Sequence, residues 1–261
     1  MTLDHYAGAG PRWASGATLV YGPLAGVLVA ASPHPLAGRV VLDAGAGTGV
    51  VSSALDAVGA RVVAVDFSHG MLAWEQAVRP PCAVGDVRAL PLAADAVDDC
   101  VAAFVLNHLT HPAAGMRELA RVTRPGGAIL VTVFGNESRS AARDRVDEVA
   151  AGEGWIAPPW YVELKTAAAP VLGSAANMAA AATIAGLADV AVREEDVDVG
   201  VTGAEALVAY RFGQAQFAGW LDEIGPERAG QVARRAVAAV GPAMAPYRPT
   251  VVLLSARVAS A

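Results

Sequence analysis

The chain has 261 residues, of which 54% are hydrophobic and 17% are charged, and it carries a formal net charge of −6 at pH 7. This composition excludes a disordered chain and suits one large domain with a well-buried core. The acidic balance also argues against a nucleic acid as partner, because contacts with phosphates require a basic protein face.

The apolar segments are too short or too interrupted for a membrane protein. The longest, residues 19–31, contains two glycines and a proline and falls short of the roughly 20 apolar residues that cross a bilayer. The first residues show no basic segment followed by an apolar one, so we expect no secretory signal. Cys82 and Cys100 suit a reducing compartment as small buried side chains. We therefore expect a cytoplasmic protein without a membrane partner.

From residue 40 to residue 134, strand-like apolar runs alternate with helical stretches, a pattern that predicts a doubly wound α/β sheet. Strands are expected at 40–43, 61–66, 82–85, 96–106 and 128–134. Helices are expected at 50–58, 70–78 and 113–123. A helix stop and turn, Arg124-Pro125-Gly126-Gly127, precedes the last of these strands.

After residue 134 the alternation loosens. Residues 135–173 hold no clean strand and carry Pro158-Pro159-Trp160-Tyr161, so we expect a lid or binding loop there. The remaining expected elements are a helix at 174–187, strands at 189–199 and 250–258, and a helical insertion at 203–240 between those two strands.

A glycine-rich turn follows the first expected strand. Gly45, Gly47 and Gly49 stand on alternate positions, and Asp43 lies just upstream. Glycine has no Cβ and so allows both the tight turn and a close approach to a ligand, which predicts a nucleotide-like cofactor at the carboxyl end of the strand. The spacing is G-x-G-x-G, with Val50 in place of a third dinucleotide glycine, and it departs from the G-x-G-x-x-G fingerprint.

Four further segments follow this turn along the chain. They are Asp66 at the end of an apolar strand, Gly85-Asp86-Val87 before Leu90-Pro91, residues 104–109 and residues 119–127. Together with the turn they resemble the motifs of class I S-adenosylmethionine-dependent methyltransferases, in the small-molecule branch that includes quinone-biosynthesis and natural-product tailoring enzymes. The resemblance covers residues 36–134.

The resemblance implies an α/β fold: a Rossmann-like, doubly wound seven-stranded sheet with helices on both faces. A helical lid from the N-terminus and from the insertion between strands 6 and 7 completes it. We accordingly expect a single methyltransferase domain over 1–261. Its parts are an N-terminal cap (1–37), a cofactor-binding core (38–135), a lid loop and helix (136–188), and strands 6 and 7 (189–261) with a helical insertion at 203–241.

The resemblance also implies S-adenosyl-L-methionine as cofactor and assigns residues to its parts. Asp43 and the backbone of the glycine turn would hold the methionine part. Asp66 would accept both ribose hydroxyls, and Asp86 would receive the exocyclic amine of adenine. Tyr21 resembles a tyrosine that relatives place over the cofactor's carboxylate. The expected cofactor-binding residues are Tyr21, Asp43, Gly45, Ala46, Gly47, Gly49, Asp66, Phe67, Met71, Gly85, Asp86, Val87 and Ala103.

His108 is the candidate catalytic base. It follows the expected fourth strand, where the transferred methyl group should point, and an imidazole can take a proton from a hydroxyl or amine near neutral pH. The alternative is that His108 only shapes the pocket. His108 and His111 also have metal-like spacing, but no third ligand accompanies them, so no metal site is expected. Asp98 and Asp99, at the amino end of the strand, are interpreted as a solvated turn.

Aromatic residues of the lid and the insertion predict an apolar acceptor pocket. The expected pocket residues are Asn107, Trp155, Trp160, Tyr161, Tyr210 and Phe217. The alternative for several of them is packing of the roof against the sheet. A diphosphate-bearing acceptor would require clustered cations, and only scattered candidates such as Arg211 and Arg248 are present.

Three classes of function follow. The first is methyl transfer to an oxygen, nitrogen or carbon atom of a small, largely hydrophobic acceptor in bacterial secondary metabolism. The second is a cyclase or rearrangement enzyme of the same fold, which would release no S-adenosylhomocysteine. The third is an NAD-binding or non-catalytic binding protein, which the spacing of the glycine turn disfavours. The sequence assigns no oligomeric state.

Overall fold

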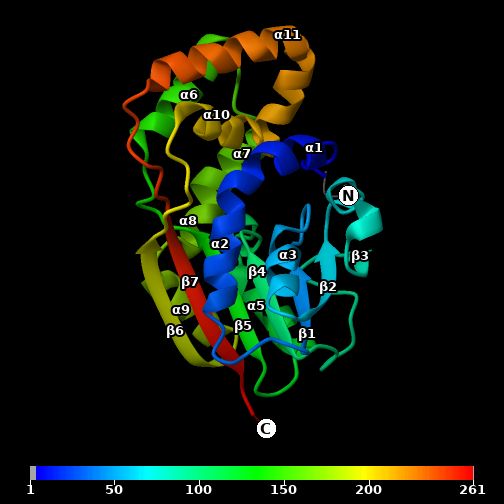
Figure 1. Cartoon of the computed structure of the whole chain (residues 1–261). Coiled ribbons are helices and arrows are strands. Elements are labelled where there is room, and N and C mark those ends of the chain that lie inside the picture. Colours follow the sequence, from blue (N-terminus) through cyan, green and yellow to red (C-terminus); the bar gives the residue numbers. More distant parts are fainter. Residues whose placement is uncertain (1–3, 261) are drawn as a thin grey trace.

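The computed structural model describes residues 4–260 and is built around one seven-stranded sheet (Figure 1). The strand order is β3-β2-β1-β4-β5-β7-β6. Neighbouring strands are parallel except for β7, which lies antiparallel between β5 and β6. The strands are β1 (Val40–Ala44), β2 (Arg61–Asp66), β3 (Cys82–Val84), β4 (Asp99–Ala103), β5 (Ala128–Phe134), β6 (Leu187–Asp196) and β7 (Thr250–Val258). The predicted Rossmann-like fold class is confirmed.

Helices flank the sheet and extend beyond the carboxyl ends of its parallel strands (Figure 1). The α-helices are α1 (Gly10–Arg12), α2 (Thr18–Ala30), α3 (Val50–Ala57), α4 (His69–Leu72), α5 (Pro112–Val122), α6 (Ala141–Gly152), α7 (Pro159–Glu163), α8 (Ala169–Leu172), α9 (Ala175–Ile184), α10 (Ala204–Phe212) and α11 (Ala215–Val240). Shorter π-helical or 3-10 turns are η1 (Trp13–Ala17), η2 (Gln76–Val78), η3 (Leu106–His108) and η4 (Leu164–Ala168).

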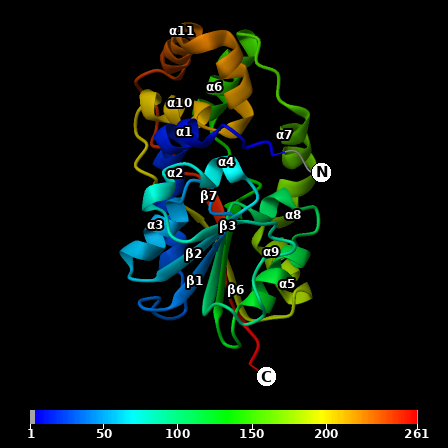
Figure 2. The same cartoon turned by 90° about the vertical axis from the view of Figure 1, so that its right-hand side faces the viewer.

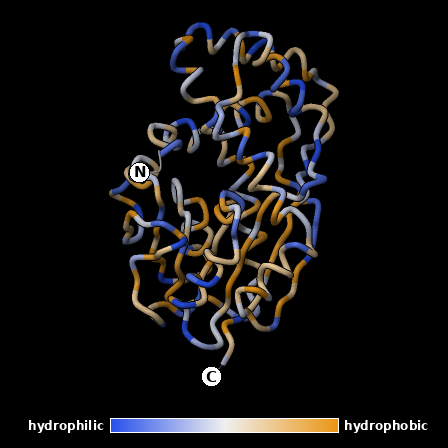
Figure 3. Tube along the Cα trace, turned by 180° about the vertical axis from the view of Figure 1, so that it is seen from behind, coloured by the Kyte–Doolittle hydropathy of each residue, from blue (hydrophilic) through white to orange (hydrophobic). Residues whose placement is uncertain are grey.

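The central strands are buried on both faces, as expected for parallel strands that helices cover. Val41 and Leu42 are successive residues of β1 whose side chains point to opposite faces, and neither is exposed. The helices α2 and α3 cover the face of Val41, whereas α5, α8 and α9 cover the face of Leu42 (Figure 2). Hydrophobic residues are accordingly concentrated along the central strands (Figure 3).

A helical cap, formed by α6, α10 and α11, lies beyond the carboxyl ends of the parallel strands (Figure 1). It has a hydrophobic core of its own, made by Val146, Ala150, Val208, Phe212, Phe217, Leu221, Val232 and Ala236. The long helix α11 bends at Gly225, where φ is 76°. The cap stands over the edge of the sheet at which the glycine turn lies.

The amino-terminal helical stretch is unbroken, although the sequence predicted an interrupted apolar segment. Pro23 lies inside α2. By length and composition alone Gly10–Ala30 could cross a membrane, as could Pro159–Leu172 together with Ala175–Ile184, a pair bent by 77°. In the structure, α2 contributes Leu28 and Val29 to the core that it shares with α3 and the sheet. A core helix of a globular domain meets the same criteria, and α2 packs as one.

Two elements of the core are shorter than predicted. The helix expected at 70–78 ends at Leu72, because the Arg79 guanidinium donates to the carbonyls of Met71 (2.9 Å) and Leu72 (3.4 Å). These carbonyls would otherwise accept the next helical N–H groups. The strand expected at 96–106 spans only Asp99–Ala103, because Phe104 takes a left-handed φ of 56° and leaves the strand.

The segment expected as a lid loop is mostly helical. Residues 135–173 contain α6, α7, η4 and α8, and α6 begins at Ser140, whose hydroxyl accepts from the N–H of Arg143. The apolar pattern of α6 is weak because its buried residues are only Val146 and Ala150. The strand expected at 189–199 is also displaced: β6 begins at Leu187 and has a register shift before Ala191.

Candidate functional site

The glycine turn between β1 and α3 has a backbone that glycine adopts most readily. Gly45, Gly47 and Gly49 have φ values of 77°, 52° and 95°. A Cβ at Gly45 would lie 2.6 Å from the Cβ of Val105, so the turn packs directly on the segment after β4. The order of the strands reverses between β1 and β4, and open α/β sheets bind ligands at such a point.

Two acids flank the turn, the buried Asp43 and the half-buried Asp66. Asp43 is 1% exposed and accepts from Ser52 Oγ at 2.6 Å, while its Oδ1 has no partner among residues 4–260. Burial raises the pKa of Asp43 to about 6. Asp66 accepts from the N–H groups of Gly47 and Ser68, both at 2.7 Å, and burial raises the pKa of this acid as well. The unpartnered oxygen of Asp43 fits an N–H donor of a ligand.

Arg79 is a site residue that the sequence analysis missed. Its Nη1 donates to the carbonyl of Gly47 at 2.7 Å and so holds the glycine turn. Its Nε and Nη2 are buried and have no partner within the described part of the chain. Arg79 also opposes part of the effect of burial on the pKa values of Asp43 and Asp66. No spacing pattern points to Arg79, because the contact depends on how the chain folds back after β2.

The predicted adenine segment follows β3. A Cβ at Gly85 would lie 2.6 Å from Cδ of Pro91, so the segment is closely packed. Val87 belongs to the main core. The Asp86 carboxylate accepts from Nε and Nη2 of Arg88 at 3.0 and 2.5 Å, and this hydrogen bonding lowers the pKa of Asp86. In the structure Asp86 is therefore the ion-pair partner of Arg88, and its role toward adenine stays a prediction.

The segment after β4 contains a strained residue and two polar side chains. Phe104 is a bulky residue with a φ of 56°, a conformation that costs roughly 1–3 kcal/mol and is frequent at functional sites. The Oδ1 of Asn107 is buried and has no partner among the described residues. His108 Nε2 lies 3.3 Å from the Tyr6 hydroxyl.

His108 is open to solvent on one side and crowded by protein on the others. The resulting desolvation lowers the pKa of His108 to about 4. The imidazole is therefore neutral at pH 7 and a weaker base than an ordinary histidine.

Aromatic rings of the N-terminal segment meet those around β4. Tyr6 lies 5.7–5.9 Å, centroid to centroid, from Trp13, His108 and Trp160. Tyr21 meets the ring of Phe104 edge-on at 4.9 Å. Tyr6 thus links the His108 ring to aromatic rings from distant parts of the chain. No sequence pattern pointed to Tyr6, Trp13 or Phe134, which stand singly and follow no period.

The predicted pocket residues fall into two groups. Trp160 of α7 adjoins the ring of Tyr6, and Tyr161 meets the ring of Trp160 edge-on. Phe217 has no exposed surface, and Trp155 stacks on it at 4.3 Å. These contacts fit the alternative of packing within the cap, and a place of the two residues in the pocket stays a prediction. Tyr210 is 2% exposed and lies in the core between the cap and the sheet.

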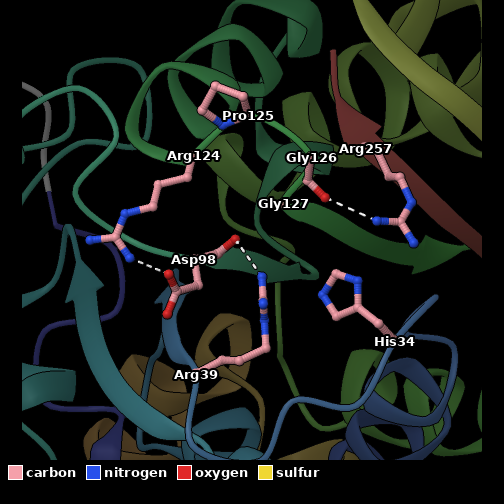
Figure 4. Close-up of a pocket in the computed structure, with 8 residues that line it drawn as sticks. All are labelled: His34, Arg39, Asp98, Arg124, Pro125, Gly126, Gly127 and Arg257. Carbon is pink, nitrogen blue, oxygen red and sulfur yellow. Dashed lines mark hydrogen bonds and ion pairs between the residues drawn. The ribbon is translucent and has the colours of Figure 1, made fainter. Parts of the chain in front are cut away.

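A pocket of about 480 Å³ lies at the amino edge of the sheet, away from the glycine turn (Figure 4). Asp98 pairs there with Arg124 (Figure 4). Asp99 is unexposed and accepts from Arg39 at 2.5 Å, from His34 at 2.8 Å and from the first N–H of β5 at 2.7 Å. The interpretation of the two acids as a solvated turn is therefore wrong, because they fasten the strands together.

Within residues 4–260, no three His, Cys, Asp or Glu side chains gather as metal ligands would. His111 precedes α5, and its Nδ1 lies 3.1 Å from the hydroxyl of Thr110. Its nearest recorded polar partner is thus Thr110 and not His108.

Comparison with known sequences finds a likeness in the central part of the chain. Residues 42–131 match a family model described as a methyltransferase domain. Demethylmenaquinone methyltransferase of Mycolicibacterium paratuberculosis is 45% identical over 103 residues, which make up 40% of this chain and 45% of that protein. The chain thus spans less than half the length of the first curated relatives that it matches.

Comparison with solved structures extends the likeness to the fold of most of the chain. A putative methyltransferase from an antibiotic biosynthesis pathway of Anabaena variabilis has a TM-score of 0.62 and 16% identity, covering 91% of this chain and 99% of that one. Phosphoethanolamine N-methyltransferase 2 of Haemonchus contortus, in complex with S-adenosyl-L-methionine, has a TM-score of 0.57 and 17% identity, covering 91% and 52%.

Proposed function

Since the chain carries a class I S-adenosylmethionine-dependent methyltransferase domain, we propose that it transfers a methyl group to a small, largely hydrophobic acceptor. The observation that carries the proposal is the glycine turn with its left-handed glycines and the unpartnered oxygen of Asp43. The turn offers a cradle that Cβ atoms would fill, Asp43 offers an acceptor for an ammonium group, and Asp66 offers one for ribose hydroxyls. These residues fit S-adenosylmethionine, which supplies a methyl group already activated on a sulfonium when bound.

The protein's own residues then orient the acceptor, exclude water and take up a proton. Alignment of an acceptor with the methyl group lowers the barrier by several kcal/mol, roughly 7–11 in well-oriented systems. The rings of Tyr6, Tyr21 and Trp160 form the apolar surroundings. His108, neutral at pH 7, accepts the proton of a hydroxyl or amine acceptor at Nε2.

A quinone of the menaquinone type is the acceptor that the curated relative suggests, and its planar apolar ring suits these aromatic surroundings. The likeness to a methyltransferase of an antibiotic pathway supports a place in secondary metabolism. Cytoplasmic action is also part of the proposal, supported by the free thiols of Cys82 and Cys100.

The test is incubation with S-adenosylmethionine and a panel of hydroxylated quinones, phenols and amines, with S-adenosylhomocysteine and methylated product both quantified. Equal amounts of the two are expected, and Asp66→Ala should lose both. A product formed without S-adenosylhomocysteine would indicate a cyclase or rearrangement enzyme instead. Tight binding of NAD without binding of S-adenosylmethionine would overturn the proposal.

A further inference from the structure

Three tyrosine hydroxyls gather between the cap and the carboxyl edge of the sheet. The rings of Tyr21 and Tyr210 are 6.2 Å apart, and those of Tyr210 and Tyr247 are 5.7 Å apart. One amide nitrogen, Nε2 of Gln214, donates to the hydroxyls of Tyr21 (3.3 Å) and Tyr210 (3.4 Å). The hydroxyls of Tyr21 and Tyr210 therefore share one donor, and the ring of Tyr247 adjoins that of Tyr210.

These hydroxyls lack acceptors for their own protons among residues 4–260. Tyr21 and Tyr210 only accept in their recorded hydrogen bonds. Tyr247 is 4% exposed, and its buried hydroxyl has no partner at all. A fourth hydroxyl, that of Tyr161, accepts from Arg211 at 3.1 Å and likewise donates to no recorded group. Since buried donors are almost always paired, this set points to a ligand rich in acceptor atoms.

The same region has an excess of positive charge. Its half-buried acid, Asp147, is paired with Arg211 through hydrogen bonds of 2.6 and 2.7 Å. Arg143 is 22% exposed, and its acidic neighbour Asp144 is 3.8 Å away and largely solvated. Lys165 forms no ion pair in the part of the chain that the structure describes. Partial desolvation lowers the pKa of Lys165; Tyr161 and Asp147 oppose this lowering, and the nearby Arg143 and Arg211 add to it.

The hydroxyl cluster adjoins the segment that carries His108. Tyr21 contacts Phe104, the first residue after β4, and Arg143 is close enough to lower the pKa of Tyr210, which burial raises. We propose that the acceptor carries a carboxylate and that the hydroxyls of Tyr210 and Tyr247, with the charges of Arg143 and Lys165, bind it. A carboxylate has two oxygens with about four acceptor sites, whereas a neutral carbonyl offers half as many and no charge. This inference rests on the proposed function, because it names the class of acceptor.

The probe pair for the test is 2-naphthoate and 2-naphthamide, which share the ring system and differ in charge. Calorimetric titration is carried out with S-adenosylhomocysteine present. The carboxylate is expected to bind at least about tenfold more tightly than the amide, the effect of one or two charge-assisted hydrogen bonds. Lys165→Gln and Tyr247→Phe should each weaken naphthoate about tenfold and leave naphthamide unchanged. Arg234→Gln, an exposed arginine of α11, makes the same change of charge and should alter neither.

Affinity for S-adenosylhomocysteine reports whether each variant is folded. If Tyr247→Phe does not fold, Lys165→Gln, a substitution at an exposed residue, still decides the test. Equal affinity for the two probes, or naphthoate binding that both substitutions leave unchanged, would overturn the inference. Naphthoate preference without any methyl transfer in the acceptor panel would count against the proposed function alone. Methyl transfer confined to neutral acceptors, at equal rates in wild type and Lys165→Gln, would count against the carboxylate alone.

Discussion

Asp43 and Asp66 flank the same turn, yet their hydrogen bonds differ. Both oxygens of Asp66 accept from backbone N–H groups. Asp43 accepts from Ser52 through one oxygen only and keeps the other unpartnered in a buried position. An acid in that position favours its protonated form until a donor arrives, so ligand-free and ligand-bound protein should respond differently to pH.

In the ligand-free protein, Asp43→Asn is expected to remove the destabilisation that ionisation of the buried Asp43 causes as pH rises. The folded pKa of about 6 exceeds the ordinary 3.8, so the stabilisation by protonation is complete below about pH 4 and is lost by about pH 6. The stability of the variant relative to wild type should therefore increase by on the order of 3 kcal/mol between these pH values. Urea unfolding at several pH values measures it. Asp56→Asn, at an exposed site, should show no such trend, and a trend equally absent from Asp43→Asn would refute the assignment.

His108→Ala should lower kcat by about 10²-fold and leave the affinity for S-adenosylmethionine unchanged, because Nε2 faces the Tyr6 hydroxyl and not the glycine turn. Desolvation lowers the pKa of His108 to about 4, so protonation of this imidazole should reduce the wild-type rate only as pH approaches that value. Steady-state kinetics between pH 4 and 8 checks both points. The neighbouring His111→Ala is the control, and an unchanged kcat in His108→Ala would limit His108 to shaping the pocket.

Among the elements, the glycine turn and the segment after β4 position each other. Gly45 has a left-handed backbone and faces the side chain of Val105, while Phe104 leaves the strand in a left-handed conformation of its own. The turn, which meets the cofactor, is thus in contact with the segment that holds His108. A substitution in the glycine turn should therefore shift the segment after β4, and the reverse should also hold.

Gly45→Ala is expected to destabilise the protein by about 2–4 kcal/mol, the sum of a left-handed alanine and overpacking against Val105. Affinity for S-adenosylmethionine should fall with it. Thermal unfolding and calorimetry measure the two effects. Gly26→Ala is the matched control, because its Cβ would meet nothing within 4 Å. The double variant Gly45→Ala, Val105→Ala should recover part of the loss, and no recovery would contradict the proposed contact.

In the molecule as a whole, the cap is fastened by a buried ion pair. Arg211 of α10 is 6% exposed at its side chain and pairs with Asp147 of α6, which is 30% exposed. The same guanidinium lies 5.1 Å from the ring of Phe217 in α11. One charged group thus joins the three helices of the cap, over the hydroxyl cluster.

Asp147→Asn should cost about 3–5 kcal/mol, because it leaves the Arg211 charge buried without its counter-ion. Denaturant unfolding measures this cost. Asp222→Asn removes an exposed partner of Arg12 and should cost no more than about 1 kcal/mol. Replacing both members of the buried pair, as Asp147→Leu with Arg211→Met, should restore much of the stability. If Asp147→Asn is as mild as Asp222→Asn, the pair does not hold the cap.

The sequence by itself determined the fold class and the strands at 61–66, 128–134 and 250–258, whose bounds the structure confirms. These features are local: apolar runs of strand length and glycines at fixed spacing carry them within a few residues. Helix α6 was not predicted because it has few buried residues. The end of α4 was not predicted because it depends on the Arg79 guanidinium, seven residues further along the chain, which donates to the carbonyl of Leu72.

Only the tertiary structure decided the composition of the site. Arg79 reaches back 32 positions to Gly47, and Gln214 meets Tyr21 across 193 positions. The tertiary structure also places Trp160 beside the N-terminal rings and Phe217 inside the cap, which encloses it completely. A pattern of residues specifies which side chains an element buries, whereas the partner of a lone arginine or tyrosine depends on chain segments that only folding brings together.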